Sequence, residues 1–157
     1  MGKEIERKFL VNNADYRINA ERVFIHQGFL NNDKDRVVRI RIEDSKATLT
    51  IKGMPLGNER AEFEYAIPLT DAEQLLNEIC LKPSIKKYRF KIHHKGFIWE
   101  VDEFLEENEG LVVAEVEIPE KDTKVELPAW VGKDVSSDPR YYNSNLIDNP
   151  FNTWKTD

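Results

Sequence analysis

The sequence predicts an α+β protein built mainly from antiparallel β-strands. About eight segments alternate charged and apolar residues with a period of two, which places the two kinds of residue on opposite faces of a strand. Turn-forming residues separate neighbouring segments, as in 53–58 and 94–96, and such short connections are typical of antiparallel pairs. Two or three further stretches carry helix signals instead.

The N-terminal segment, residues 3–11, shows the alternation most fully. Glu4, Glu6 and Lys8 fall on one face of the expected strand, and apolar residues such as Ile5 alternate with them. The same reasoning predicts further strands, in chain order, at 23–30, 36–43, 47–52, 62–67, 87–92, 99–102 and 114–118.

Two stretches are predicted to be helical. Residues 70–73 read as a capping box ahead of a helix over 74–80. Near the C-terminus, Asp138 followed by Pro139 is a typical helix start, which predicts a short helix over 140–147. No linker or repeat interrupts the pattern, so a single domain is expected over residues 1–157.

Composition restricts the class of protein further. Twenty-three basic residues against 29 acidic ones give a net charge of −6, which argues against general nucleic-acid binding. Cys80 is the one cysteine, which excludes an internal disulfide and a cysteine-based zinc site. The first residues are too charged for a signal peptide, and no apolar stretch is long enough to span a membrane. A cytoplasmic protein without membrane contact is expected.

Several nucleotide and catalytic motifs are missing from the sequence. The three histidines, His26, His93 and His94, lack the spacing of a zinc site and are interpreted as surface or sheet residues. The seven glycines form neither a P-loop nor a dinucleotide-binding fingerprint. Cys80 is interpreted as a buried helix residue rather than a nucleophile, because no basic group is recognisably paired with it.

The charged faces of the strands sort by sign. A charged face is ordinarily the solvated side of a half-exposed antiparallel sheet, and for any one strand this is the better interpretation. Here, however, same-sign pairs two residues apart recur, and such pairs repel each other unless a ligand of opposite charge binds them. The cationic pairs are Arg39/Arg41 and Lys87/Arg89, and the anionic pairs are Glu4/Glu6, Glu62/Glu64, Glu100/Asp102 and Glu115/Glu117.

Together with Lys8 and Lys52, these residues give six cations against eight carboxylates, a net charge of −2. A cavity with this charge would repel a triphosphate unless divalent cations bound first. Oxygen ligands without a histidine cluster favour Mg²⁺ or Mn²⁺ over zinc, and arginine forks and lysine ammonium groups suit phosphate oxygens. The sequence therefore favours metal-dependent phosphoryl transfer.

The charged motifs of the chain resemble those of a known family. Residues 4–11, EIERKFLV, resemble the N-terminal ExExK signature of the CYTH superfamily, the triphosphate tunnel metalloenzymes. The later two-apart motifs resemble those of the family in order and spacing: RIR at 39–41, TIK at 50–52, EFE at 62–64, KYR at 87–89, EVD at 100–102, EVE at 115–117 and DPRYYN at 138–143. The resemblance covers nearly the whole chain.

The resemblance implies a closed eight-stranded antiparallel β-barrel whose charged faces line an internal tunnel. It places a few helices outside the barrel and a C-terminal helix near one mouth. Periodicity alone does not predict this inward orientation of the charges. The resemblance further implies that phosphate is bound by Lys8, Arg39, Arg41, Lys52, Lys87 and Arg89, and metal by Glu4, Glu6, Glu115 and Glu117 with Asp102 nearby.

The expected reaction is hydrolysis of a triphosphate by an attacking water, with Mg²⁺ or Mn²⁺ as cofactor. The general base is left open: Lys87 is one candidate if burial and neighbouring cations lower its pKa, and Glu62 or Glu64 would otherwise orient the water.

The short chain most resembles compact bacterial tripolyphosphatases, which cleave inorganic tripolyphosphate to pyrophosphate and phosphate. ATP and thiamine triphosphate are alternative substrates, and a class IV type adenylate cyclase or a non-catalytic polyphosphate-binding module are alternative functions. Apolar residues are expected on the outer barrel faces, where they pack either on helices or on the second subunit of a homodimer; among them are Phe63, Tyr65, Tyr88, Phe90 and Ile92.

Overall fold

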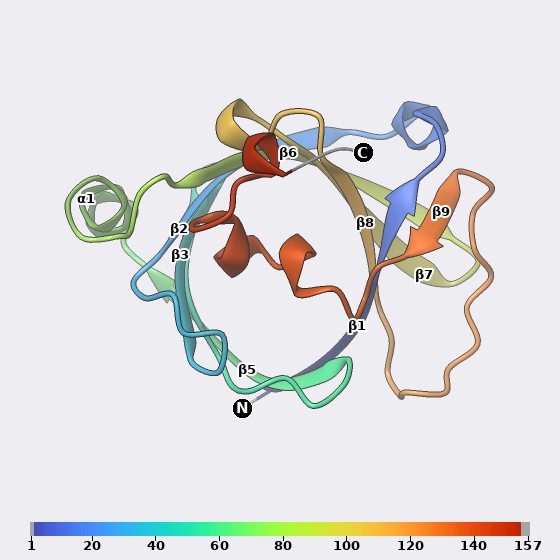
Figure 1. Ribbon diagram of the computed structural model, residues 1–157, viewed down its shortest axis with the longest axis horizontal. Helices are drawn as coiled ribbons and strands as arrows, with labels where there is room; N and C mark the ends of the chain where they lie inside the picture. The colour runs from blue at the N-terminus through green and yellow to red at the C-terminus, as the bar shows by residue number, and fades with distance from the viewer. Residues whose placement is uncertain (1, 155–157) are drawn as a thin grey trace.

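A computed structural model describes residues 2–154, so residues 1 and 155–157 of the expected domain lie outside the described part. Eight strands form a closed ring (Figure 1). They are β1 (Gly2–Val11), β2 (Arg22–Phe29), β3 (Val37–Glu43), β4 (Lys46–Lys52), β5 (Glu59–Ile67), β6 (Ile85–His94), β7 (Phe97–Phe104) and β8 (Val112–Glu117). The order around the ring is β5-β4-β3-β2-β6-β7-β8-β1, and β1 pairs with β5 to close it. The fold predicted through the family resemblance is confirmed.

All of these pairings are antiparallel, and the hairpin between β6 and β7 shows how a short connection is made. Its loop consists of Lys95 and Gly96, whose φ angles are 50° and 85°. Two successive positive φ angles give the tight two-residue turn that matches the twist of the flanking strands. The turn predicted at residues 94–96 is therefore present.

Apolar side chains cover the barrel from outside. The α-helix α1 (Leu69–Glu78) places Ala72 and Leu76 against Ile40 of β3. Elsewhere around the ring, Trp99 of β7 packs against Trp130 with ring centroids 5.9 Å apart. Because these outer faces bury the apolar residues, the alternating charged residues face the inside of the ring.

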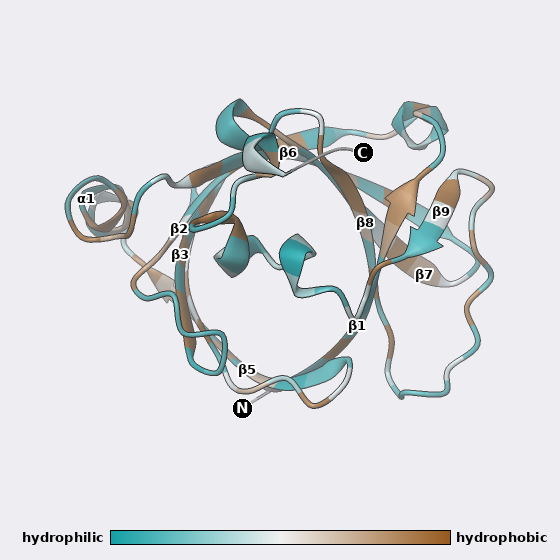
Figure 2. Cartoon of the chain, viewed as in Figure 1, coloured by the Kyte–Doolittle hydropathy of each residue, from teal (hydrophilic) through white to brown (hydrophobic). Residues whose placement is uncertain are grey.

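The C-terminal segment crosses one mouth of the barrel, where Figure 1 shows it in orange and red within the ring. It contains the 3₁₀ turns η3 (Pro139–Tyr141), η4 (Asn143–Leu146) and η5 (Phe151–Thr153). Figure 2 shows that the two turns inside the ring are largely hydrophilic. Leu146 and Ile147 nevertheless anchor the segment by packing into the core cluster that also contains Phe29.

The predicted helix over 140–147 is wrong in type, although the segment lies at a mouth as expected. Tyr142 has extended backbone angles and separates η3 from η4. Asn143, Ser144 and Asn145 favour side-chain hydrogen bonds to nearby backbone over a continuous α-helix. Asp138 does cap η3, since its side chain accepts a hydrogen bond from the Arg140 backbone NH.

The predicted capping box is also wrong. Helix α1 begins at Leu69, with Pro68 as its N-cap and no side-chain cap, so Thr70 lies inside the first turn. Pro68 has no NH to donate to the sheet, and the helix follows strand β5 directly. Cys80 lies two residues beyond the helix and is buried.

One strand was not expected, β9 (Val131–Asp134), which pairs with β1 outside the ring. Its four residues lack a clear alternating pattern, which explains why periodicity does not reveal it. Among residues 2–154, no helix is both long and apolar enough to cross a membrane.

Candidate active site

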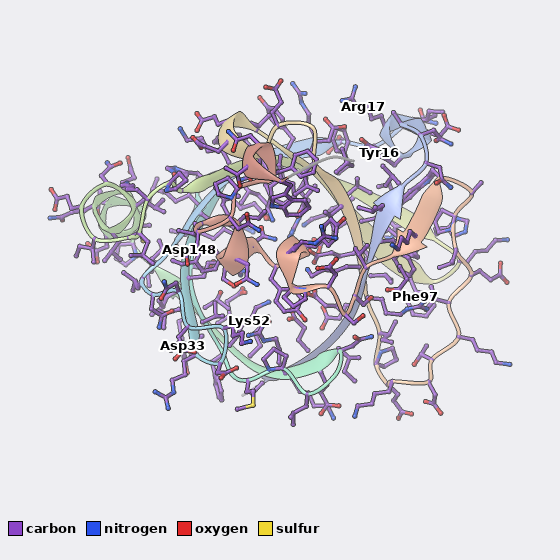
Figure 3. The ribbon with its side chains drawn as sticks, in the orientation of Figure 1. Tyr16, Arg17, Asp33, Lys52, Phe97 and Asp148 are labelled. Carbon is purple, nitrogen blue, oxygen red and sulfur yellow. The ribbon has the colours of Figure 1, made fainter. Side chains whose placement is uncertain are left out.

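The inner face of the barrel carries every cation expected to bind phosphate. One cavity is lined by all six of them: Lys8, Arg39, Arg41, Lys52, Lys87 and Arg89. Figure 3 shows Lys52 inside the ring, whereas Tyr16 and Arg17 lie outside it. Residues two apart on one strand share a face, so strand geometry places both members of each cationic pair on the same wall.

On one wall of the tunnel, Lys8 holds two carboxylates together. Its Nζ lies 2.7 Å from Glu115 Oε1 and 3.2 Å from Glu6 Oε1. Burial alone would raise the pKa of Glu115, but Lys8 and Arg89 hold it well below its usual range. For Glu6, burial and the neighbouring Glu115 raise the pKa. The two carboxylates therefore differ in how readily they lose a proton.

On the opposite side of β1, Lys52 makes a similar bridge. Its Nζ lies 2.9 Å from Glu4 Oε1 and 3.3 Å from Glu62 Oε2. Lys52 and Glu62 are direct neighbours across the β4–β5 ladder. Burial is the largest cause of the raised pKa of Glu4, and the adjacent Glu62 also raises it. Here again one cation contacts two carboxylates that lie close enough to repel each other.

Asp102 is held entirely by cations. Its Oδ1 accepts from Arg89 Nε at 2.7 Å, and its Oδ2 lies 2.7 Å from Lys87 Nζ and 2.9 Å from Arg89 Nη2. Both Lys87 and Asp102 are 1% exposed. Burial is the main reason that the pKa of Lys87 falls to about 7, with Arg89 and Arg41 adding to the fall and Asp102 opposing it. Lys87 is thus an amine that exchanges its proton near neutral pH.

Arg39 and Arg41 have no carboxylate within ion-pair distance in the described part of the chain. Arg39 donates from Nη2 to Thr50 Oγ1 at 3.1 Å, and its buried Nε finds no acceptor among residues 2–154. Arg41 donates from Nε to Gln27 Oε1 at 2.8 Å. Burial is the main cause that lowers the pKa of both, and neighbouring arginines add to it; the pKa of Arg41 falls to about 9, so Arg41 still carries charge at neutral pH. They are the cations with most capacity left for an anionic ligand.

The other predicted carboxylates lie towards the edge of the site. Glu117 is exposed and stands opposite Glu6 across the β1–β8 ladder. Burial and the carboxylates of Glu4 and Glu62 raise its pKa, which shows that negative charge gathers at this end of the tunnel. Glu64 is exposed and lies 3.5 Å from Thr50 Oγ1. Of the predicted carboxylates, Glu6 and Glu115 line the cavity. The others are not among the described residues that do: Glu4, Glu62, Glu64, Asp102 and Glu117.

The glutamates have the right chemistry for a hard divalent cation. Glu4, Glu6, Glu115 and Glu117 offer oxygen donors, and their mutual repulsion is the kind that such an ion relieves. Within residues 2–154, no three carboxyl, imidazole or thiol groups already stand in a metal-binding arrangement. The donor set therefore fits the ion, although lysine ammonium groups hold several of these oxygens here.

Sequence reasoning missed several polar residues of the site. Gln27 is fully buried inside the barrel between Ile25 and Phe29, and a single polar residue in an apolar strand face was the available signal. Asn143 of η4 ends the DPRYYN motif at 138–143, which was the available signal, but the pattern of strands gave it no role in the cavity that it lines. Arg60 also lines the cavity and donates to the backbone carbonyl of Gly53.

Comparison with known proteins gives a consistent result. Residues 2–143 match the CYTH domain. An inorganic triphosphatase of Acetivibrio thermocellus is 48% identical over 155 residues, which cover 99% of both chains. The crystal structure of the inorganic triphosphatase NE1496 has a TM-score of 0.63 at 28% identity, covering 91% of this chain and 96% of that one. The PH1012 protein from Pyrococcus horikoshii OT3 shares the fold, with a TM-score of 0.57 at 20% identity over 76% of this chain and 80% of that one.

Proposed function

The chain belongs to the CYTH domain family, and from this premise we propose that it hydrolyses inorganic tripolyphosphate to pyrophosphate and phosphate in a divalent-metal-dependent reaction. The observation that carries the proposal is the single cavity lined by all six predicted cations, two of which have no carboxylate partner in the described chain. The inorganic triphosphatase that is similar over the full length favours hydrolysis over cyclisation or binding alone.

In the proposed mechanism, Arg39 and Arg41 bind phosphate oxygens through their free guanidinium nitrogens. Lys8, Lys52 and Arg89 add positive charge around the same cavity. Lys87 is the favoured general base among the three candidates, because it lines the cavity and its pKa of about 7 allows it to take a proton from the attacking water. Glu62 and Glu64 are outside the set of described residues that line the cavity.

The proposed metal ligands are Glu4, Glu6, Glu115 and Glu117. When bound, Mg²⁺ or Mn²⁺ would supply positive charge that offsets the charge of the triphosphate. Asp102 is the least suited of the predicted ligands, since Lys87 and Arg89 already occupy both of its oxygens. We assign Asp102 instead to holding these two cations in place.

The experiment measures phosphate release from tripolyphosphate, ATP and thiamine triphosphate with Mg²⁺, Mn²⁺ or EDTA. We expect metal-dependent release, fastest from tripolyphosphate, and its loss in Glu6→Gln and Arg41→Ala. The exposed Glu126 supplies the control, since Glu126→Gln leaves the tunnel unchanged. Cyclic AMP from ATP would instead select the cyclase, and tight binding of tripolyphosphate without turnover would select the binding module.

A homodimer is proposed as the arrangement that covers the outer face of β4 and β5. Ile51 and Tyr65 are 39% and 55% exposed there, and Phe63 is the cross-strand neighbour of Ile51. Phe90, by contrast, is buried beneath Tyr16 of the same chain. Sedimentation velocity of the wild type and Tyr65→Glu tests this: a monomer in the wild type would refute it.

A further inference from the structure

Asn143 is the point at which the C-terminal segment reaches into the tunnel. It is the first residue of η4, and Leu146 and Ile147, which follow it, are buried in the core cluster with Phe29 and Val37. The apolar anchor fixes the backbone of the segment across the barrel mouth. The amide of Asn143 is therefore presented to the cavity from a firmly packed element.

The side-chain oxygen of Asn143 accepts two hydrogen bonds from the barrel wall. Lys87 Nζ donates at 2.8 Å, and Gln27 Nε2 donates at 2.8 Å. The other end of the Gln27 amide, Oε1, accepts from Arg41 Nε at 2.8 Å. Gln27 is fully buried, so the middle of this chain of contacts is shielded from water, while Asn143 and Arg41 at its ends are partly exposed to the cavity. One amide oxygen thus connects Lys87 on β6 to Arg41 on β3 through Gln27 on β2.

These contacts limit the directions in which Lys87 and Arg41 donate. A protonated lysine has three N–H donors, and Asp102 and Asn143 accept two of those of Lys87. The position of the remaining N–H, or of the lone pair after deprotonation, then follows from tetrahedral geometry. For Arg41, the bond from Nε to Gln27 leaves the Nη groups for a ligand.

We propose that Asn143 is a positioning residue for the triphosphatase reaction, which orients the Lys87 amine directly and the Arg41 guanidinium through Gln27. The proposal rests on the proposed function of the tunnel and adds a role for the C-terminal segment. Asn143 acts on the alignment of Lys87 rather than on the number of cations in the cavity. Its loss is therefore expected to lower kcat and to change KM little.

The experiment compares Asn143→Leu with Asn145→Leu, using tripolyphosphate and a saturating divalent metal. Leucine keeps the approximate volume and removes the acceptor. Asn145 is the matched control, because it lies on the same turn and donates to the Pro139 carbonyl within the segment. We expect Asn143→Leu to lower kcat about 10- to 100-fold, the effect of one hydrogen bond to a charged group, with KM changed less than about threefold. Asn145→Leu should leave kcat within about twofold.

Several results would overturn the proposal. They are an unchanged kcat in Asn143→Leu, an equal loss in Asn145→Leu, or a higher KM with an unchanged kcat, which would make Asn143 a binding contact. If Asn143→Leu does not fold, Asn143→Ser tests the same contacts with a smaller polar side chain, and the same kcat loss is expected.

A crystal structure of the variant tests the geometry without any activity. We expect the Lys87 amine to turn about its remaining contact with Asp102 and to leave its wild-type position, and Gln27 to turn away from Arg41 Nε. Unchanged positions of Lys87 and Gln27 would refute the positioning role even if the wild type were inactive. An inactive wild type would refute the proposed function but not the positioning role. An active wild type whose kcat is unchanged in Asn143→Leu would refute the positioning role alone.

Discussion

Lys87 and Asp102 form an ion pair inside the barrel, with Nζ 2.7 Å from Oδ2 and both side chains 1% exposed. Burial works against the ionised carboxyl, but Arg89 and Lys87 lower the pKa of Asp102 to about 2, so it stays charged. Lys87 behaves differently, because burial among other cations lowers its pKa to about 7. The pair therefore combines a permanent anion with an amine that titrates near neutral pH.

The pH dependence of hydrolysis should follow the titration of the Lys87 amine. If its neutral amine takes the proton of the attacking water, kcat/KM rises as the pH increases through about 7. The carboxylate of Asp102 raises the pKa of Lys87, so removing that charge lowers the pKa further. We expect Asp102→Asn to move the rising limb of the pH–rate profile to lower pH.

The neighbouring residue supplies the control for this prediction. Glu103 faces the outside of the barrel, where its carboxylate binds Tyr16 and Arg17. In Glu103→Gln, the rising limb of the pH–rate profile should lie at the same pH as in the wild type. If the rising limb does not move in Asp102→Asn either, a group other than Lys87 titrates.

We expect Arg39 to lower the free energy of unfolding of the ligand-free protein while it contributes to ligand binding. Its guanidinium is buried beside Arg89, its Nε has no acceptor among the described residues, and burial lowers its pKa. Replacing a buried cation that lacks a carboxylate partner with an apolar side chain removes a desolvation cost. We expect Arg39→Met to raise the free energy of unfolding of the ligand-free protein by about 1 kcal/mol, measured by urea denaturation.

Ligand binding should stabilise Arg39→Met less than it stabilises the wild type. A triphosphate ligand at about 100 times its Kd stabilises the wild type by about 2.7 kcal/mol, and a tenfold weaker affinity removes about 1.3 kcal/mol of this. Thermal unfolding with Mg²⁺ and a non-hydrolysable imido analogue of tripolyphosphate, which is not turned over, measures the difference. Lys124→Met, at an exposed position outside the tunnel, should leave the ligand effect intact. An undiminished effect in Arg39→Met would remove Arg39 from the phosphate site.

The sequence predicts the strands and the cationic wall of the site, but not how the site is completed. Period-two alternation shows that Arg39 and Arg41 share a face, and it does not show whether that face turns inward. The inward orientation came from the family resemblance. The packing of apolar residues such as Ile40 and Trp99 outside the ring now explains it physically.

Single polar residues escape such patterns for a physical reason. Asn143 depends on a long-range contact with Lys87, 56 positions away, and local periodicity carries no information about it. Gln27 likewise sits in an apolar strand face and acquires its role from residues on other strands. Contacts of this kind follow from the closure of the barrel, which local sequence signals do not specify.

Metal binding should weaken as the pH falls. Burial and Glu115 raise the pKa of Glu6, and burial and Glu62 raise that of Glu4, so both retain a proton to a higher pH than an ordinary glutamate. A metal ligand must be deprotonated, and protons therefore compete with the ion. We expect the Mn²⁺ concentration for half-maximal activity to rise as the pH is lowered towards the raised pKa values of these two glutamates, by up to about tenfold per pH unit for each proton released.

Metal removal gives the matching control. EDTA should abolish hydrolysis, and excess Mn²⁺ should restore it. A thermal shift caused by Mn²⁺ in the wild type should disappear in Glu6→Gln, while Glu126→Gln keeps it. If the Mn²⁺ concentration for half-maximal activity does not change with pH, Glu4 and Glu6 are not the metal ligands.

Gly28 should be required for the packing of α1 on the barrel. A Cβ atom at this position of β2 would lie 3.0 Å from Leu76 Cδ2 and 3.0 Å from Cys80 Cβ. Because both neighbours are buried, the helix end must shift to admit a methyl group. We expect Gly28→Ala to lower the free energy of unfolding by about 1–3 kcal/mol, measured by urea denaturation. Gly53→Ala is the control, since its Cβ would meet Ala61 Cβ at an ordinary 3.6 Å, and its effect should stay within about 0.5 kcal/mol. Equal stability of Gly28→Ala and the wild type would show that α1 adjusts without losing its contacts.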